Sequence, residues 1–210
     1  AELYGWGDLV PETVLATIEG SQSSVQAWVS AESLAAYREA LRNRTENPNW
    51  NDDLLAATKM IPEEQWLRLV VLDFVAGARD RHSNNVGVRF VLKADGPATF
   101  GLVAWDNSVT FGKTLRLYHQ VFHKRIFRDT IDLEPIWGDF VKVDDARLAS
   151  VLEGLVSQEE IEHACVRRRF LEDFPYKMPW KVLSCGEEGD GFPPHEHLFR
   201  TDVAPLPLPH

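Results

Sequence analysis

The stretch that decides the fold is Leu72-Asp73-Phe74-Val75-Ala76-Gly77-Ala78-Arg79-Asp80-Arg81-His82-Ser83-Asn84-Asn85-Val86-Gly87-Val88. It has the pattern of an apolar helix that ends, a polar loop, and a strand that begins. Upstream, Pro62 and two following glutamates are typical of a helix N-terminus, and Gly77 is a natural C-terminal residue. We therefore expect a largely buried helix between Pro62 and Gly77, because apolar residues cover most of its circumference.

Two apolar segments follow the polar loop. They run from Val86 to Leu92 and from Thr99 to Trp105, and a turn-rich connection separates them. This pattern predicts a β-hairpin. Asp106 comes directly after the second segment, so the hairpin would bring Asp106 back beside Asn85.

The polar loop and Asp106 contain the residue types that phosphoryl transfer requires. Asp80 can accept a proton from an attacking hydroxyl, and the side-chain oxygens of Asn85 and Asp106 suit Mg²⁺. Arg81 and His82 can orient groups or contact phosphate. The alternative interpretation is a plain turn, since Asp, Asn and Ser favour turns. The apolar strand before Asp106 favours function, because carboxylates seldom lie in such sequence without a partner.

Weaker patterns organise the rest of the chain. Strands are expected at residues 13–18 and 25–29 with a turn at 19–24, followed by a helix at 31–42 capped by Ser30 or Ser33. Further helices are expected at residues 115–128, 144–155 and 158–170, the last with a capping box that begins at Ser157. The run Arg167-Arg168-Arg169 is interpreted as a solvated helix face rather than an anion site.

Composition limits the function classes. The chain has 210 residues, 44% of them hydrophobic, and a net charge of −10. This charge argues against general nucleic-acid binding, which needs a basic face. Two cysteines, Cys165 and Cys185, make no disulfide framework and favour a reduced, cytoplasmic setting. No apolar run is long enough for a transmembrane segment.

Two segments resemble a known family. Asp80-Arg81-His82-Ser83-Asn84-Asn85 resembles the Asp-Arg-His-x-x-Asn catalytic loop of the phosphatidylinositol 3-/4-kinase-like superfamily. Residues 105–111 are similar to the metal-binding segment of its bacterial, HipA-related members. Residues 9–14 and 24–29 resemble the later N-lobe strands and hinge of these proteins, and residues 174–180 resemble their C-terminal end.

The resemblance implies an α+β, protein-kinase-like fold. Residues 1–30 would be an N-lobe remnant and hinge, residues 31–185 the helical C-lobe, and residues 186–210 a Pro-rich tail. The site residues that it implies are Asp80 as the catalytic acid, with Arg81 beside it and His82 as the alternative proton acceptor; Asn85 and Asp106 as metal ligands; and Gln26, Ala27 and Trp28 bordering the adenine of ATP.

The sequence before Leu9 has no glycine-rich phosphate loop and no strand lysine with its glutamate partner. We therefore expect an ATP- and Mg²⁺-dependent phosphotransferase whose missing N-lobe parts come from preceding residues or a complementing chain. The alternative is a catalytically impaired kinase-like nucleotide-binding or interaction module, and a third is an interaction domain with structural Asp80 and Asp106. The hydroxyl acceptor, whether protein, lipid or small molecule, stays open.

Overall fold

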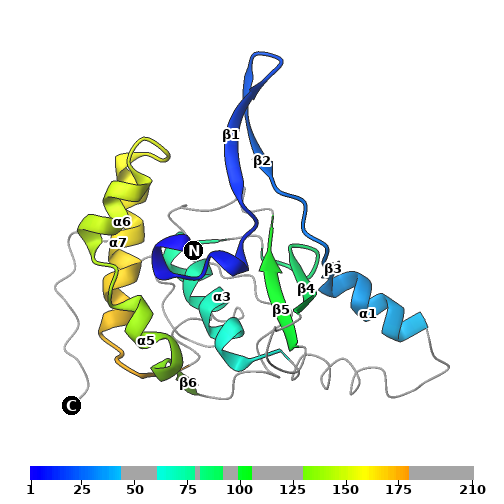
Figure 1. Ribbon diagram of the computed structural model, residues 1–210. Coiled ribbons are helices and arrows are strands. Elements are labelled where there is room, and N and C mark those ends of the chain that lie inside the picture. The colour runs from blue at the N-terminus through cyan, green and yellow to red at the C-terminus, as the bar shows by residue number, and fades with distance from the viewer. Residues whose placement is uncertain (44–60, 79–80, 92–98, 106–129, 180–210) are drawn as a thin grey trace, which may run out of the picture.

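The computed structural model describes residues 1–43, 61–78, 81–91, 99–105 and 130–179 (Figure 1). Helices and small antiparallel sheets alternate along this part of the chain. The α+β class expected from the sequence is confirmed. The expected helix at 115–128, the Pro-rich tail, Asp80 and Asp106 lie outside the described residues. In the described part, no helix is long and apolar enough to cross a membrane.

Helix α3, Glu63–Ala76, lies at the centre of the molecule (Figure 1). The helical group formed by residues 134–172 packs on one side of it, and the sheet formed by residues 32–33, 86–91 and 99–104 lies on the other. Most of its side chains are buried, including Trp66 and Phe74. Gly77 ends the helix in a left-handed conformation with φ of 62°, and its N–H bonds back to the last turn. The buried helix and its end were therefore predicted correctly.

The β-hairpin expected after the loop is also confirmed. Strands β4, Val86–Val91, and β5, Thr99–Ala104, pair in antiparallel fashion with Val86 opposite Ala104. Strand β3, Glu32–Ser33, adds to the free side of β4. The sheet order is therefore β3-β4-β5, so β3 lies beside the hairpin as a short third strand.

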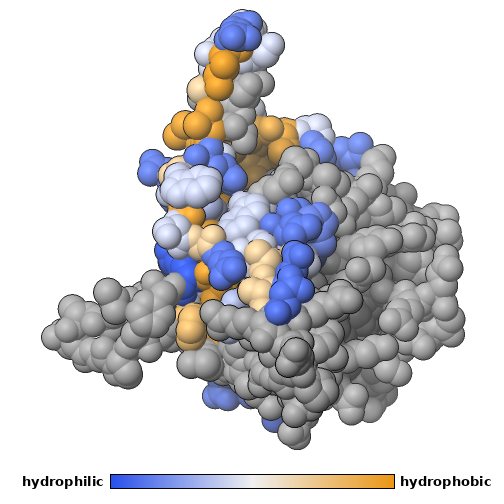
Figure 2. Space-filling view, turned by 90° about the vertical axis from the view of Figure 1, so that its right-hand side faces the viewer, coloured by the Kyte–Doolittle hydropathy of each residue, from blue (hydrophilic) through white to orange (hydrophobic). Residues whose placement is uncertain are grey.

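The first ribbon projects from the body of the molecule (Figures 1 and 2). It pairs β1, Thr13–Ile18, with β2, Ser21–Gln26, through a two-residue turn. Both turn residues have positive φ, 51° at Glu19 and 81° at Gly20, which is the geometry of a tight hairpin turn. The prediction of a long turn at 19–24 and a strand at 25–29 was therefore wrong. Strand pairing uses backbone groups, which serine supplies as well as an apolar residue does, so hydrophobicity marked the second strand poorly.

Helix α1, Leu34–Asn43, begins three residues later than expected. The hydroxyl of Ser33 accepts a hydrogen bond from the N–H of Ala36 at 3.0 Å. Ser33, the second candidate, is thus the N-cap. Since Glu32 and Ser33 pair with β4, this segment is extended and Ser30 cannot cap the helix.

The remaining elements form the helical side and its supports. Two 3₁₀ turns, η1 Glu2–Tyr4 and η2 Gly7–Leu9, begin the chain. Three helices follow one another on the helical side: α5 (Glu134–Phe140), α6 (Asp145–Leu152) and α7 (Gln158–Glu172). The strand before them, β6 (Thr130–Asp132), pairs with the strand after them, β7 (Lys177–Pro179). The capping box is present, since the Ser157 hydroxyl and the Glu160 carboxylate each accept the other residue's backbone N–H.

The arginine run is not a solvated face. Arg167 and Arg168 are 0% and 4% exposed, and only Arg169 lies at the surface. Arg167 donates from Nε to the carbonyl of Val75 at 2.9 Å, at the C-terminal end of α3. Consecutive helical residues are rotated by about 100° around the axis, so three in a row cannot share one face of a helix that is packed on two sides.

The contact between Gly77 and Arg167 gives a stability test. A Cβ at Gly77 would lie 2.9 Å from the Arg167 guanidinium carbon, whereas one at Gly154, which also has positive φ, would meet nothing within 4 Å. We expect Gly77→Ala to lower the free energy of unfolding by about 2–4 kcal/mol, from strain plus overlap. Gly154→Ala should cost about 1 kcal/mol, from strain alone. Urea denaturation measures both, and equal losses would contradict the contact.

Candidate functional site

Arg81 anchors the polar loop to α3. Its side chain is 3% exposed and forms an ion pair with Asp73, which is 2% exposed. Arg81 Nε and Nη2 donate to the carboxylate of Asp73 at 3.0 and 2.9 Å. A planar guanidinium suits such two-point pairing. Burial raises the pKa of Asp73, and the facing Arg81 guanidinium opposes that rise.

The same guanidinium also binds two main-chain oxygens. Arg81 Nη1 donates to the carbonyls of Asn85, at 3.0 Å, and Trp105, at 2.8 Å. One side chain therefore joins the last turn of α3, the end of the polar loop and the end of β5. Arg81 was expected to orient groups or contact phosphate, and these contacts give it an orienting position.

The hairpin ends beside Asn85. The N–H of Trp105 donates to the carbonyl of Asn85 at 3.1 Å, which extends the β4–β5 ladder by one residue. Asn85 is buried, with 5% of its surface exposed. Trp105 directly precedes Asp106 in the sequence. The structure thus brings the chain next to Asp106 opposite Asn85, while the Asp106 side chain itself lies outside the described residues.

The loop is held on its other side by α1. The N–H of Ala35, in the first turn of that helix, donates to the carbonyl of Ser83 at 3.1 Å. Within the loop, the N–H of Asn85 donates to the carbonyl of His82 at 2.9 Å. Contacts from α1, from α3 and from the residue after β5 therefore converge on Arg81, Ser83 and Asn85 of the loop.

His82 has a defined ring orientation. Its Nδ1 accepts a hydrogen bond from the N–H of Asn84 at 3.2 Å. Nδ1 is therefore the acceptor in this contact, and the contact fixes the ring relative to the loop backbone.

The residues expected to border adenine lie where the ribbon ends. Gln26 closes β2 and donates from Nε2 to the hydroxyl of Thr13 at 3.1 Å, and the N–H of Ala27 donates to the carbonyl of Glu12 at 2.7 Å. Trp28 is 96% exposed. The ribbon therefore uses the Ala27 N–H, so this group is not available to hydrogen-bond a base.

Asp73 and Trp105 are residues of the candidate site that the sequence reasoning did not single out. The signal for Asp73 was a lone carboxylate on an otherwise apolar helix face, eight residues before an arginine. No such signal marks Trp105, whose role depends on the register of the hairpin.

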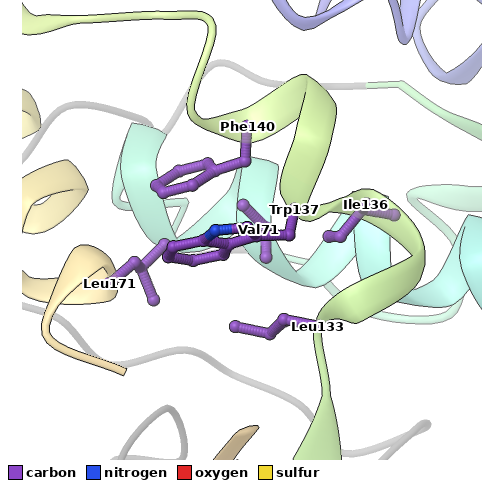
Figure 3. A pocket seen from close by; sticks show the side chains of 6 residues that line it. All are labelled: Val71, Leu133, Ile136, Trp137, Phe140 and Leu171. Carbon is purple, nitrogen blue, oxygen red and sulfur yellow. The ribbon is translucent and has the colours of Figure 1, made fainter. Parts of the chain in front are cut away.

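The described residues contain no group of three or more His, Cys, Asp or Glu side chains that could hold a metal ion. A shallow apolar depression lies between α3, α5 and α7 (Figure 3). It is lined by Val71, Leu133, Ile136, Trp137, Phe140 and Leu171. Its lining side chains are aliphatic or aromatic, so it is a packing feature of the core rather than part of the loop site.

No protein-family model matches the chain, and a search of curated proteins found no match.

The buried ion pair makes a strong prediction. Asp73→Asn removes the charge that compensates Arg81, so the free energy of unfolding should fall by about 3–5 kcal/mol. Lys142→Gln, which removes the exposed ion pair between Lys142 and Asp139, is the control. It should change stability by less than about 1 kcal/mol. Chemical denaturation of both variants checks this, and an Asp73→Asn loss as small as the control would contradict the anchor.

Proposed function

We propose that this chain is the catalytic lobe of an ATP- and Mg²⁺-dependent phosphotransferase that transfers the γ-phosphate to a hydroxyl group. One observation carries the proposal: Arg81 and a main-chain hydrogen bond hold Asn85 opposite Trp105, the residue before Asp106. An amide at Asn85 and a carboxylate at Asp106 would supply oxygen ligands of the kind that Mg²⁺ prefers.

The residues divide the chemistry between them. Asn85 and Asp106 would hold Mg²⁺, which neutralises charge on the β- and γ-phosphates. Asp80 accepts the proton of the attacking hydroxyl. His82 lies on the same loop, with its Nδ1 accepting the Asn84 N–H, and is the alternative proton acceptor. Arg81 keeps the loop in place from beneath, since its guanidinium is committed to Asp73 and two carbonyls.

The proposal also gives the projecting ribbon a role. Val14, Ile18 and Val25 are exposed, and Val14 lies directly opposite Val25. Since side chains two apart share a face of a strand, all three lie on the same face. This apolar face would pack against the rest of an N-lobe, which preceding residues or a complementing chain would supply together with the phosphate-binding lysine.

A second candidate is a kinase-like module that binds nucleotide without transferring phosphate. It is favoured by the composition of the ribbon, because residues 13–26 contain no lysine or arginine that could contact the α- and β-phosphates. Incubation with γ-labelled ATP and a panel of protein, lipid and small-molecule acceptors tests this candidate, because any transfer of label would exclude a module that only binds nucleotide.

The metal assignment predicts the effect of two substitutions. Asp106→Ala and Asn85→Ala should each weaken binding of ATP in the presence of Mg²⁺ by about tenfold or more. Asp173→Ala, at an exposed helix end, is the matched control and should bind as the wild type does. Titration calorimetry measures these affinities. Unchanged affinity in Asp106→Ala would remove that residue from the metal site.

The proton-transfer assignment predicts a different pattern. Asp80→Asn should lower the rate of phosphate transfer by about 10²–10⁴-fold and leave Mg²⁺–ATP affinity nearly unchanged. His82→Gln removes the basic ring but leaves Asp80 in place, so its rate should stay well above that of Asp80→Asn. The opposite order of rates would make His82 the proton acceptor.

A further inference from the structure

The indole of Trp105 lies across Gly87 of the neighbouring strand. Gly87 is opposite Val103, so Trp105 is its diagonal neighbour, which is within reach of an aromatic side chain. A Cβ at Gly87 would overlap the far edge of the indole and would lie 3.2 Å from the Cβ of Ala31. The backbone of Gly87 is not left-handed, so glycine is needed here for space alone.

Three polar groups of Trp105 fix the end of the loop. The indole Nε1 donates to the carbonyl of Asn84 at 2.7 Å, and the backbone N–H donates to the carbonyl of Asn85 at 3.1 Å. The carbonyl of Trp105 accepts from Arg81 at 2.8 Å. The carbonyls of two consecutive loop residues are therefore bound by one residue, which fixes the orientation of the peptide groups on both sides of the Asn85 side chain.

We propose that Trp105 is a positioning residue for the divalent-cation site, and that Gly87, which has no side chain, leaves the space that the indole of Trp105 occupies. This inference rests on the proposed function. Trp105 acts through Asn84 and Asn85. With the indole packed on Gly87, the hydrogen bonds from Trp105 fix the backbone position of Asn85, and therefore the position from which its side-chain amide extends. Mg²⁺ requires near-ideal octahedral geometry, whereas Ca²⁺ accepts flexible coordination. A loosened Asn85 therefore weakens Mg²⁺ binding more than Ca²⁺ binding.

The test compares two metals in the full chain. ATP is titrated calorimetrically at stepped concentrations of MgCl₂ or CaCl₂. Trp105→Phe keeps an aromatic ring and loses the Nε1–H donor. It should raise the Mg²⁺ concentration needed for half-maximal ATP binding by about tenfold or more, and the Ca²⁺ concentration by clearly less. Trp137→Phe, the same change on α5, should leave both unchanged. A merely structural role of Trp105 would shift both metals equally.

A second pair of variants tests the packing of the Trp105 indole on Gly87. Gly87→Ala displaces the indole, so it should reproduce the Mg²⁺ defect and lower the midpoint of urea unfolding. Adding Trp105→Leu to Gly87→Ala removes the overlap, so the midpoint should recover in part while the Mg²⁺ defect persists.

The outcomes separate the two claims. A wild type that binds no Mg²⁺–ATP overturns the proposed function and the metal role of Trp105 with it. Two other results overturn only the role of Trp105, provided that the wild type binds Mg²⁺–ATP. In one, Trp105→Phe needs the same Mg²⁺ concentration as the wild type; in the other, it loses affinity equally for Mg²⁺ and Ca²⁺.

Discussion

The site depends on the interactions of the buried Arg81 guanidinium. A buried cation is costly unless every donor finds a partner, and this one has a carboxylate on α3 and two carbonyls at the loop and strand ends. These partners come from three separate segments of the chain. They must therefore lie in one arrangement for the charge to be satisfied, and that arrangement puts Asn85 opposite Trp105. A pair that adds little net stability can still fix geometry in this way.

The elements around the loop could be predicted because their signals are local. The apolar run before Gly77 and the two apolar strands after the loop are set by periodicity and by glycine at a helix end. The return of the chain toward Asn85 followed from the hairpin pattern. Once two antiparallel strands of similar length are joined by a short connection, their outer ends must meet.

What the sequence could not predict depended on packing. Arg167 is buried because α7 packs against α3, where the Arg167 side chain meets the Val75 carbonyl, and no local pattern carries that information. The N-cap of α1 moved to Ser33 because strand pairing took the residues before it. Asp73 gained its role from a partner eight residues away, across a helix end. The packing of Trp105 on Gly87 likewise depends on the register of β4 and β5, which the sequence of a single strand does not determine.

The central claim is that the Asn85 side chain lies against a divalent cation bound with ATP. Mn²⁺ broadens the NMR signals of nearby nuclei, so the side-chain amide of Asn85 can report on it directly in ¹⁵N-labelled protein. With ATP present, a substoichiometric amount of Mn²⁺ should broaden the Asn85 amide strongly and leave that of Asn43, at the far end of α1, sharp. An Asn85 signal that stays as sharp as that of Asn43 would contradict the account.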